Sequence, residues 1–501
     1  MKINTKSKNF KIILFSVIGL IVLGAVVMVL TLTAPDEGGG DSEQTAAATD
    51  DPALLLQPEK EGAISSIYVE NSQGSYTVTM GEKDKEKTYT LKGMENLDDG
   101  LLDTSLFGTL EKNLTDMKAR SVVEENPTDL AQYGLDKPQA KATVTYENGN
   151  TFTLLVGNTV TSGAANYVMV DGKNTVYSYY TYSLNHVMTF DNMSFIGIGV
   201  IPTIAQSDAA DISKITVKRK DWDEPLILES MPELPEDSTS IQVFTYTFTS
   251  PYDVYLDLNT GTDYINALSG LTAEKAVAVN PTDEDYKKYG LDDPFCEVDE
   301  LVGETIYRLY IGDAVTEEVK DEETGVVNTK TVAYYAYSNK SPHAIYRISA
   351  EKLIWASMGV ADYMSRLFIM PYIYDVDTFT FKDANSDFSV KIDGDAEKCT
   401  FYLNGKETDG AKFRALYQFV VSCRGEELYT DEARGELLAE YTFKYEIDKE
   451  PDTVSLYASD DRKVIIAING KNIFKTKWNY RTRLSENAKA FVEGGEIIEN
   501  Y

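Results

Sequence analysis

One short pattern occurs twice in this 501-residue chain and constrains its fold more than any other feature. It consists of Asn126-Pro127-Thr128-Asp129, Tyr133-Gly134-Leu135-Asp136 and Pro138, and it recurs as Asn280-Pro281-Thr282-Asp283, Tyr289-Gly290-Leu291-Asp292 and Pro294. Similar strands precede and follow the two copies, which are collinear over about 120 residues. Self-similarity of this kind is the signature of repeated structural units. The sequence therefore predicts at least two copies of one fold.

A third and more divergent copy is expected to begin near Asp377. Its best match to the first copy places residues 469–474 against 171–177, each after an apolar strand. The Asn-Pro-Thr-Asp opening is missing, and Gly435-Glu436-Leu437 is the candidate counterpart of Tyr133-Gly134-Leu135. Domains usually have about 100 to 200 residues. The predicted repeat units are residues 61–205, 206–370 and 371–501.

Each copy has the pattern of several alternating strands and one short amphipathic helix. In the first copy the expected strands are 75–80, 88–91, 142–146, 151–156 and 166–170, with hairpin turns at Asn148-Gly149 and Asp171-Gly172. Apolar residues at helical spacing are Leu106, Leu110, Leu114 and Met117 in the first copy, Ile265, Leu268 and Leu271 in the second, and Phe413, Leu416, Val420 and Cys423 in the third. The predicted fold class is α+β, with mainly antiparallel sheets that are each covered by short helices.

The recurrent pattern has a structural interpretation. Thr128 is expected to cap a short helical turn, and Gly134 to end it in the left-handed conformation. Leu135 then folds back as an apolar partner, and Pro138 prevents continuation of the helix. The same logic applies to the second copy. We favour this interpretation over a ligand contact, which the pattern alone leaves open.

The same residues carry a family resemblance. Together with Leu154-Leu155-Val156-Gly157-Asn158, the two motifs resemble the bacterial domain-of-unknown-function 4340 family. The resemblance is good over 64–190 and 212–356 and weak over 376–490. It implies a membrane-anchored extracytoplasmic protein that works beside ABC-type transport or gliding-motility auxiliary components. It brings no catalytic residues, since the family has none assigned.

The N-terminal region has the pattern of a membrane anchor. Residues 12–34 contain no charge, and as a helix the most apolar part would be about 31 Å long, which is one hydrocarbon core. The basic tail at 1–11 is expected in the cytoplasm, because positive charge is retained on that side. Residues 35–60 mix Gly, Ser, Ala and acids and are expected to form a flexible linker. The alternative is a signal peptide cleaved after Ala34. The expected location is the cell membrane, single-pass, with the bulk of the chain extracytoplasmic.

Composition limits the chemistry that is open to this chain. It has 47 basic and 80 acidic side chains and a formal net charge of −33, so we expect no nucleic-acid partner. Three cysteines cannot form a disulfide framework, although a Cys399–Cys423 bridge remains open. His186 and His343 occupy unmatched positions in the repeats, and standard enzyme motifs do not occur. We predict no enzyme, no catalytic, cofactor-binding or metal-binding residue, and no cofactor.

Three functions are weighed on this basis. The first is a non-enzymatic accessory or scaffold in a membrane protein complex, with an ABC-type permease as one expected partner. The second is a binding module for a cell-wall glycan or a peptide, for which exposed tyrosines are the candidates. The third is a hydrolase that uses two acidic residues. The tyrosines in question are Tyr177, Tyr179, Tyr180, Tyr182, Tyr334, Tyr335 and Tyr337. Acid-rich stretches at 292–293, 320–323 and 393–395 lack calcium-loop spacing and are expected to be solvated.

Overall fold

The computed structural model describes residues 54–57, 62–95, 97, 100–205, 212–234, 238, 240–320, 325–445 and 449–501. The predicted cytoplasmic tail at 1–11 and membrane helix at 12–34 lie outside the described residues, as does most of the predicted linker. The described helices include none with the length and apolar character needed to span a bilayer. The chain divides into two compact bodies after Leu55, and all of the sheets belong to the body from Leu56 to Tyr501.

The first sheet has eight antiparallel strands in the order β3-β2-β1-β5-β6-β7-β8-β4. Their bounds are β1 Ile64–Asn71, β2 Gly74–Lys83, β3 Glu86–Leu91, β4 Ser121–Glu125, β5 Ala140–Tyr146, β6 Thr151–Thr159, β7 Ala165–Val170 and β8 Thr175–Tyr180. Each strand that the sequence predicted lies within one of them, and Gly149 and Gly172 take positive φ in their turns as expected. The strand β4 comes from between β3 and β5 in sequence but pairs at the far edge of the sheet, next to β8.

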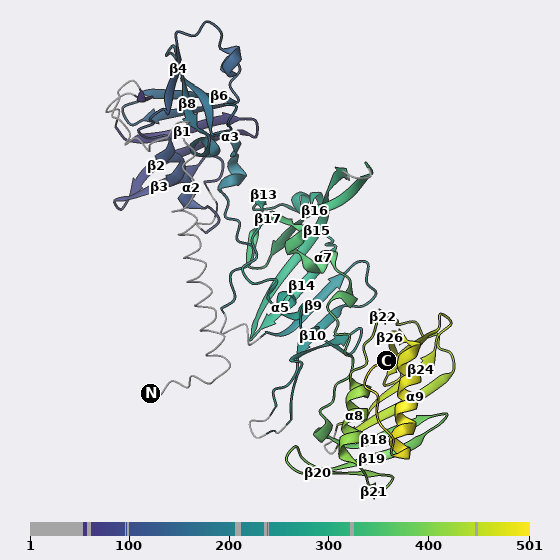
Figure 1. Cartoon of the computed structure of the whole chain (residues 1–501). Coiled ribbons are helices and arrows are strands. Elements are labelled where there is room, and N and C mark those ends of the chain that lie inside the picture. Colours follow the sequence, from purple (N-terminus) through teal and green to yellow (C-terminus); the bar gives the residue numbers. More distant parts are fainter. Residues whose placement is uncertain are drawn as a thin grey trace, which may run out of the picture. The chain divides into compact units, whose positions relative to one another are not determined.

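The second and third sheets repeat this order, each with one more strand at the β3 end. The second is formed by β9 Ile212–Arg219, β10 Leu226–Ser230, β11 Tyr246–Ser250, β12 Val254–Tyr255, β13 Lys275–Val279, β14 Cys296–Val302, β15 Thr305–Lys320, β16 Val327–Ser338 and β17 Ser341–Ser349. The third is formed by β18 Val376–Asp383, β19 Asp387–Gly394, β20 Cys399–Leu403, β21 Lys406–Glu407, β22 Glu427–Leu428, β23 Leu437–Tyr445, β24 Asp452–Ala458, β25 Lys463–Ile468 and β26 Lys471–Lys477. Figure 1 shows the three sheets, which we call the first, second and third unit together with the helices on them.

The strand registers repeat as well as the strand order. The pairing of β1 with β5 shifts by one residue after Ile64, and that of β18 with β23 shifts after Val376. The pairing of β9 with β14 shifts at the corresponding place, where Ile212 pairs with Val302. An extra residue at one position of one strand bends it locally. A bulge at the same place in three sheets indicates that the units share one fold, including the divergent third.

Each unit has a covering helix where the apolar spacing predicts one, although the predicted residues Leu114, Leu268, Leu271 and Cys423 lie beyond the helix ends. These helices are α2 Thr104–Asn113, α5 Gly261–Asn266 and α8 Gly410–Val421. Asp103 caps α2 by accepting a hydrogen bond from the Ser105 amide, at 3.1 Å. The helix α2 ends at Asn113, so Met117 lies in the loop that follows the helix, and its side chain is buried there.

The remaining helices are short, except for one at the C-terminus. The short ones are α3 Asn185–Thr189, α6 Asp283–Lys288 and α7 Ile354–Ser357, and the 3₁₀ turns are Ala131–Tyr133, Thr181–Leu184, Asn192–Phe195, Ala350–Lys352, Val360–Asp362 and Ile373–Asp375. The 16-residue helix α9, Trp478–Glu493, was not predicted, and it contacts α8 and strands β23, β25 and β26 of the third unit (Figure 1). Its buried side chains include Tyr480, Leu484, Ala488 and Phe491, at helical spacing.

The second unit has a charged residue in its core. Glu300 lies on the buried face of β14 and is 0% exposed, and within the described part of the chain neither carboxylate oxygen has a hydrogen-bond partner. Burial raises the pKa of Glu300 to about 8. The residues at the corresponding register are Val144 in the first sheet and Phe443 in the third. The core of this sheet therefore contains one carboxyl group where its counterparts are apolar.

Candidate functional site

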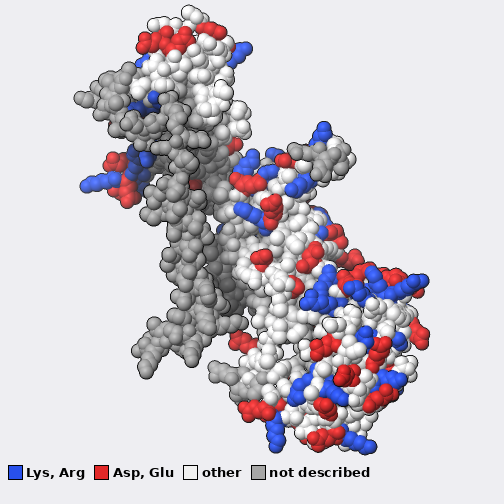
Figure 2. All heavy atoms as spheres, viewed as in Figure 1, with Lys and Arg blue, Asp and Glu red and all other residues white. Residues whose placement is uncertain are grey.

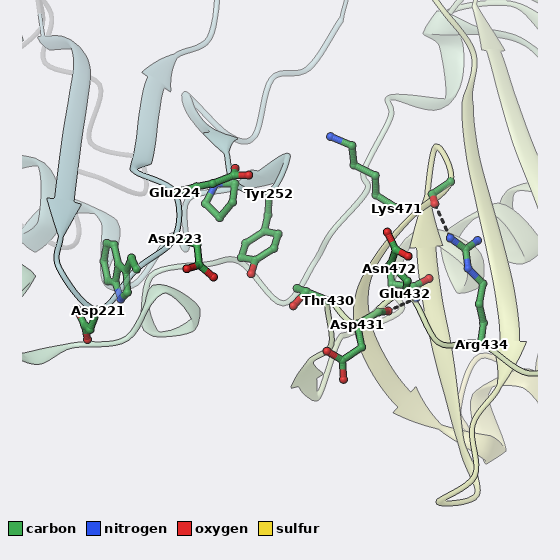
Figure 3. Close-up of a pocket in the computed structure, with 13 residues that line it drawn as sticks. Asp221, Asp223, Glu224, Tyr252, Thr430, Asp431, Glu432, Arg434, Lys471 and Asn472 are labelled. Atoms are coloured by element: carbon green, nitrogen blue, oxygen red, sulfur yellow. Dashed lines mark hydrogen bonds between the residues drawn. The ribbon is translucent and has the colours of Figure 1, made fainter.

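A polar hollow of about 840 Å³ is lined by both aromatic and charged side chains. Its lining residues from the second unit are Asp221, Trp222, Asp223, Glu224, Pro251 and Tyr252, and those from the third are Thr430, Asp431, Glu432, Arg434, Gly470, Lys471 and Asn472. They come from the β9–β10 and β11–β12 turns and from the loop before β23 and the β25–β26 turn. Figure 3 shows the two groups of side chains facing each other across the hollow.

Arg219, at the end of β9, fixes the turn that carries the aromatic wall. Its guanidinium donates hydrogen bonds to the Trp355 carbonyl at 3.2 Å and to the Met358 carbonyl at 2.7 Å. It also pairs with Asp221 at 2.6 Å, and this hydrogen bond lowers the pKa of the Asp221 carboxyl. The same guanidinium lies 4.5 Å from the centre of the Trp222 ring. One face of the indole is thus held by a cation that is itself fixed by the protein.

The opposite wall is fixed by Arg434. Its guanidinium donates to the Gly470 carbonyl at 2.8 Å and lies 4.9 Å from the centre of the Tyr457 ring. Next to it, Asn472 is 8% exposed and its amide donates to the Asp431 carbonyl at 2.6 Å (Figure 3). The Asn472 side-chain oxygen is buried and has no partner among the described residues. A buried acceptor without a partner favours a donor supplied by water or a ligand.

These side chains suit a neutral, hydroxyl-rich ligand. Indole and phenol rings such as Trp222 and Tyr252 offer flat apolar faces with one polar group each. Carboxylates accept hydrogen bonds from hydroxyls, and Asp223, Glu224 and Glu432 lie at the edges of the hollow. A guanidinium such as that of Arg434 can donate hydrogen bonds to the ring and hydroxyl oxygens of such a ligand. The hollow thus combines flat apolar ring faces with hydrogen-bond donors and acceptors.

Charges of both signs are mixed on the surface around the third unit. On the face shown in Figure 2, its Lys and Arg side chains lie among Asp and Glu side chains. Several are paired, such as Lys463 with Glu427 and Lys475 with Asp461 at 3.2 Å. Such pairs are partly exposed and contribute little to stability. The large negative charge of the sequence is therefore not concentrated into one acidic face in this view.

The recurrent motif packs inside each of the first two units. Gly134 and Gly290 have φ of +66° and +67° and end their helical turns as predicted. A Cβ added to Gly134 would lie 2.4 Å from the Asn158 side chain, and one added to Gly290 would lie 2.2 Å from that of Asp313. The leucines that follow, Leu135 and Leu291, are 3% and 4% exposed in small clusters on the sheets.

The predicted cap is correct in one copy and wrong in the other. Thr282 caps α6 with a reciprocal pair of hydrogen bonds to Asp285. In the first copy the Ala131 amide donates instead to Asp129, at 2.8 Å, and Thr128 does not cap the turn. The first copy has two fewer residues between its motifs, so it forms a single 3₁₀ turn rather than a short α-helix.

One known family matches part of this chain. Residues 101–228 match the family described as a domain of unknown function, DUF4340. The DUF4340 match begins just before α2 and ends in β10, so it contains the first copy of the motif and the start of the second unit. The family resemblance is thereby supported, and the number of copies is not part of the match. No curated protein and no solved structure matches the chain.

Most of the seven tyrosines considered for binding are packed, both inside and outside the DUF4340 match. Tyr177 and Tyr179 are buried, whereas Tyr180 is 42% and Tyr182 is 74% exposed. The rings of these last two lie 5.5 Å apart. In the second unit Tyr334 is buried, Tyr335 packs on Tyr289 and Tyr337 stacks on Tyr310. Packing therefore accounts for five of the seven, and the aromatic residues of the hollow, Trp222 and Tyr252, were not singled out by the sequence.

The histidines and cysteines are separated in the fold. His186 is buried on α3, where burial lowers its pKa, and His343 lies on β17 of another unit. Cys296, Cys399 and Cys423 are all free, so the bridge that the sequence left open is not formed. Across the described residues, no three His, Cys, Asp or Glu side chains form a group that could hold a metal ion.

Proposed function

We propose that this protein is a membrane-anchored extracytoplasmic scaffold, a non-enzymatic accessory of an ABC-type transport or cell-envelope complex. The observation that carries the proposal is that the recurrent residues pack within their own units. The motif glycines and leucines make contacts inside their own units, so what is repeated along the chain is an architecture. Repeated architecture is typical of proteins that present extended surfaces to partners. The apolar segment at 12–34 supplies the anchor.

The topology of the proposal is tested by cysteine labelling in intact cells. Cys296 and Cys423 are 0% and 2% exposed, so replacing Cys399 by serine removes the most accessible native thiol. In that background Glu407→Cys, on the exposed edge strand β21, should react with a membrane-impermeant maleimide. Ser7→Cys, in the predicted cytoplasmic tail, is the matched control and should react only after the cells are opened. Equal labelling of both positions in intact cells would refute the anchored topology.

The scaffold role is tested by mild crosslinking of native membranes, followed by isolation of the full-length protein. We expect membrane proteins of one complex, with permease subunits among them, in amounts that do not depend on the hollow. Recovery of the protein alone would contradict this role.

A second candidate function is glycan binding at the hollow, and the fixed indole of Trp222 beside carboxylates is what favours it. Full-length protein should be retained on insoluble cell-wall polymer, and Trp222→Ala should reduce its affinity about fivefold or more, since an aromatic contact contributes about 1 kcal/mol or more. Trp478→Ala is the matched control, because Trp478 is 37% exposed and does not line the hollow. Unchanged retention of Trp222→Ala would remove this candidate.

A further inference from the structure

Each segment that joins two units forms backbone hydrogen bonds with the unit that follows it, and the pairing recurs from one joint to the next. Between the covering helix and the next strand of each unit lies a short stretch that we call the acceptor edge: residues 117–119, 271–273 and 423–425. In the second unit the Val200 amide donates to the Leu271 carbonyl at 2.9 Å, and the Ala273 amide donates to the Ile198 carbonyl at 2.8 Å. The chain leaving the first unit thus pairs with the acceptor edge of the second.

The third unit repeats this joint. The Gly425 amide donates to the Arg366 carbonyl at 2.9 Å, and Leu367 forms a β-bridge with Arg424. In the preceding joint the bridge is Gly199 with Thr272. Each incoming segment places an apolar side chain into the unit it enters, Val200 at 1% and Phe368 at 4% exposure. The two joints therefore use the same backbone pairing and the same buried position.

The first unit has an acceptor edge too, and no unit precedes it among the described residues. Its occupant comes from just upstream of the sheet. The Leu56 amide donates to the Met117 carbonyl at 3.0 Å, as Val200 does to Leu271, and Leu56 is 0% exposed. Both acceptor residues, Met117 and Leu271, lie four positions before the strand that follows. Leu56 thus takes the place that Val200 takes in the next unit.

Further hydrogen bonds hold this occupant. The Gln57 side-chain oxygen accepts from the Met117 amide at 3.1 Å, and its amide nitrogen donates to the Leu114 carbonyl. Lys173 donates to the Leu56 carbonyl at 3.0 Å. The side chain of Gln57 thus satisfies one donor and one acceptor that follow α2, in the way a neighbouring strand would.

We propose that the acceptor edge is a recognition site for an extended segment with one buried apolar residue, and that Leu56 and Gln57 occupy it in the first unit as an intramolecular latch. Backbone pairing gives the affinity in such strand addition, and the pocket for alternate side chains gives the specificity. The folded body then begins at Leu56, inside the range 35–60 that the sequence assigns to a linker. This inference does not depend on the proposed function.

Hydrogen exchange of the full-length protein tests the latch. We expect slow exchange at the Leu56 and Met117 amides in the wild type. Gln57→Ala removes the acceptor of the Met117 amide and should accelerate exchange over 114–119 about tenfold, with β1 unchanged. Gln73→Ala is the matched control, because the Gln73 side chain is exposed and, among the described residues, donates a hydrogen bond to its neighbour Ser72. Wild-type exchange at Leu56 as fast as in an unfolded peptide would overturn the proposal.

A second arm tests recognition in trans. Leu56→Asp should release the latch, and a synthetic peptide of residues 50–60, added in excess, should restore slow exchange over 114–119. The same peptide with aspartate at position 56 should not. If Leu56→Asp also unfolds β1, the exchange rates over 114–119 in Gln57→Ala and in its control Gln73→Ala decide whether the latch exists. The acceptor edge does not recognise this segment if Leu56→Asp leaves the exchange rates over 114–119 unchanged, or if both peptides slow exchange there equally.

Discussion

The buried carboxyl of Glu300 makes the stability of the second unit depend on pH. The group is 0% exposed and burial raises its pKa from 4.5 to about 8, so the folded unit binds a proton that the unfolded chain releases above about pH 4.5. The contribution of Glu300 to stability therefore falls as the pH rises from about 4.5 to about 8 and does not change further above that range. Glu300→Gln keeps the shape of the side chain and removes the charge, so it should abolish this dependence.

The size of the effect follows from the two pKa values. A difference of about 3.5 units at 1.36 kcal/mol per unit gives about 5 kcal/mol, all of it lost by pH 9. At pH 5 the wild type and Glu300→Gln should unfold at nearly the same denaturant concentration. At pH 9 the variant should be the more stable by about 5 kcal/mol, which is a large part of the stability of an ordinary domain.

Trp355 reports on this unit in a background with Trp222→Phe and Trp478→Phe, because it is 1% exposed and its helix α7 contacts β14. Urea unfolding of the full chain, followed by its fluorescence at pH 5, 7 and 9, gives the free energies. Glu297→Gln is the control, since Glu297 lies on the same strand with a 35% exposed side chain. An equal pH dependence in wild type and Glu300→Gln would refute the reasoning.

Two further predictions concern packing and thiol chemistry. A Cβ on residue 312 would lie 2.3 Å from the Tyr289 carbonyl oxygen, so Gly312→Ala should lower the free energy of unfolding in urea by about 2 kcal/mol or more. A Cβ on residue 100 has no atom within 4 Å, so the control Gly100→Ala should lower it far less. Similar losses in the two variants would contradict the close packing at Gly312. At pH 8 iodoacetamide should modify the half-buried Cys399 well before Cys296, as measured by mass spectrometry of the native protein. Cys296 is 0% exposed, and burial raises the pKa of its thiol to about 12. Modification of both at equal rates would contradict the fold around Cys296.

Features set by neighbouring residues could be predicted from the sequence. Gly149 and Gly172 mark hairpin turns because glycine accepts positive φ, and Asp103 marks a helix start because its carboxylate caps a free amide. The third unit was expected from a weak match alone, and its strand order and bulge agree with those of the others. Gly435 approaches the Ala458 carbonyl, but Leu437 is 49% exposed and lies in a strand, so it does not serve as Leu135 does.

Features set by distant residues could not be predicted. Glu300 breaks the alternation of its strand, since Asp299 and Glu300 are adjacent polar residues, and the register against β9 is what assigns Glu300 to the buried face. The hollow combines turns such as Asp221 to Glu224 with loops that lie some 200 residues later. Trp222 could not be singled out without knowing that Arg219 lies against its ring.

The joints explain why the repeat in the sequence and the repeat in the fold are offset. The similarity in sequence starts at the first strand of each unit, near Ile64 or Ile212. The folded unit begins earlier, since the N–H and C=O groups of its acceptor edge are satisfied only by the segment that precedes that strand. Cutting the chain between Val200 and Ile212 would leave the second unit with the Leu271 carbonyl unpaired and the site of Val200 empty. Leu56 satisfies the same requirement in the first unit, where no preceding sheet is described.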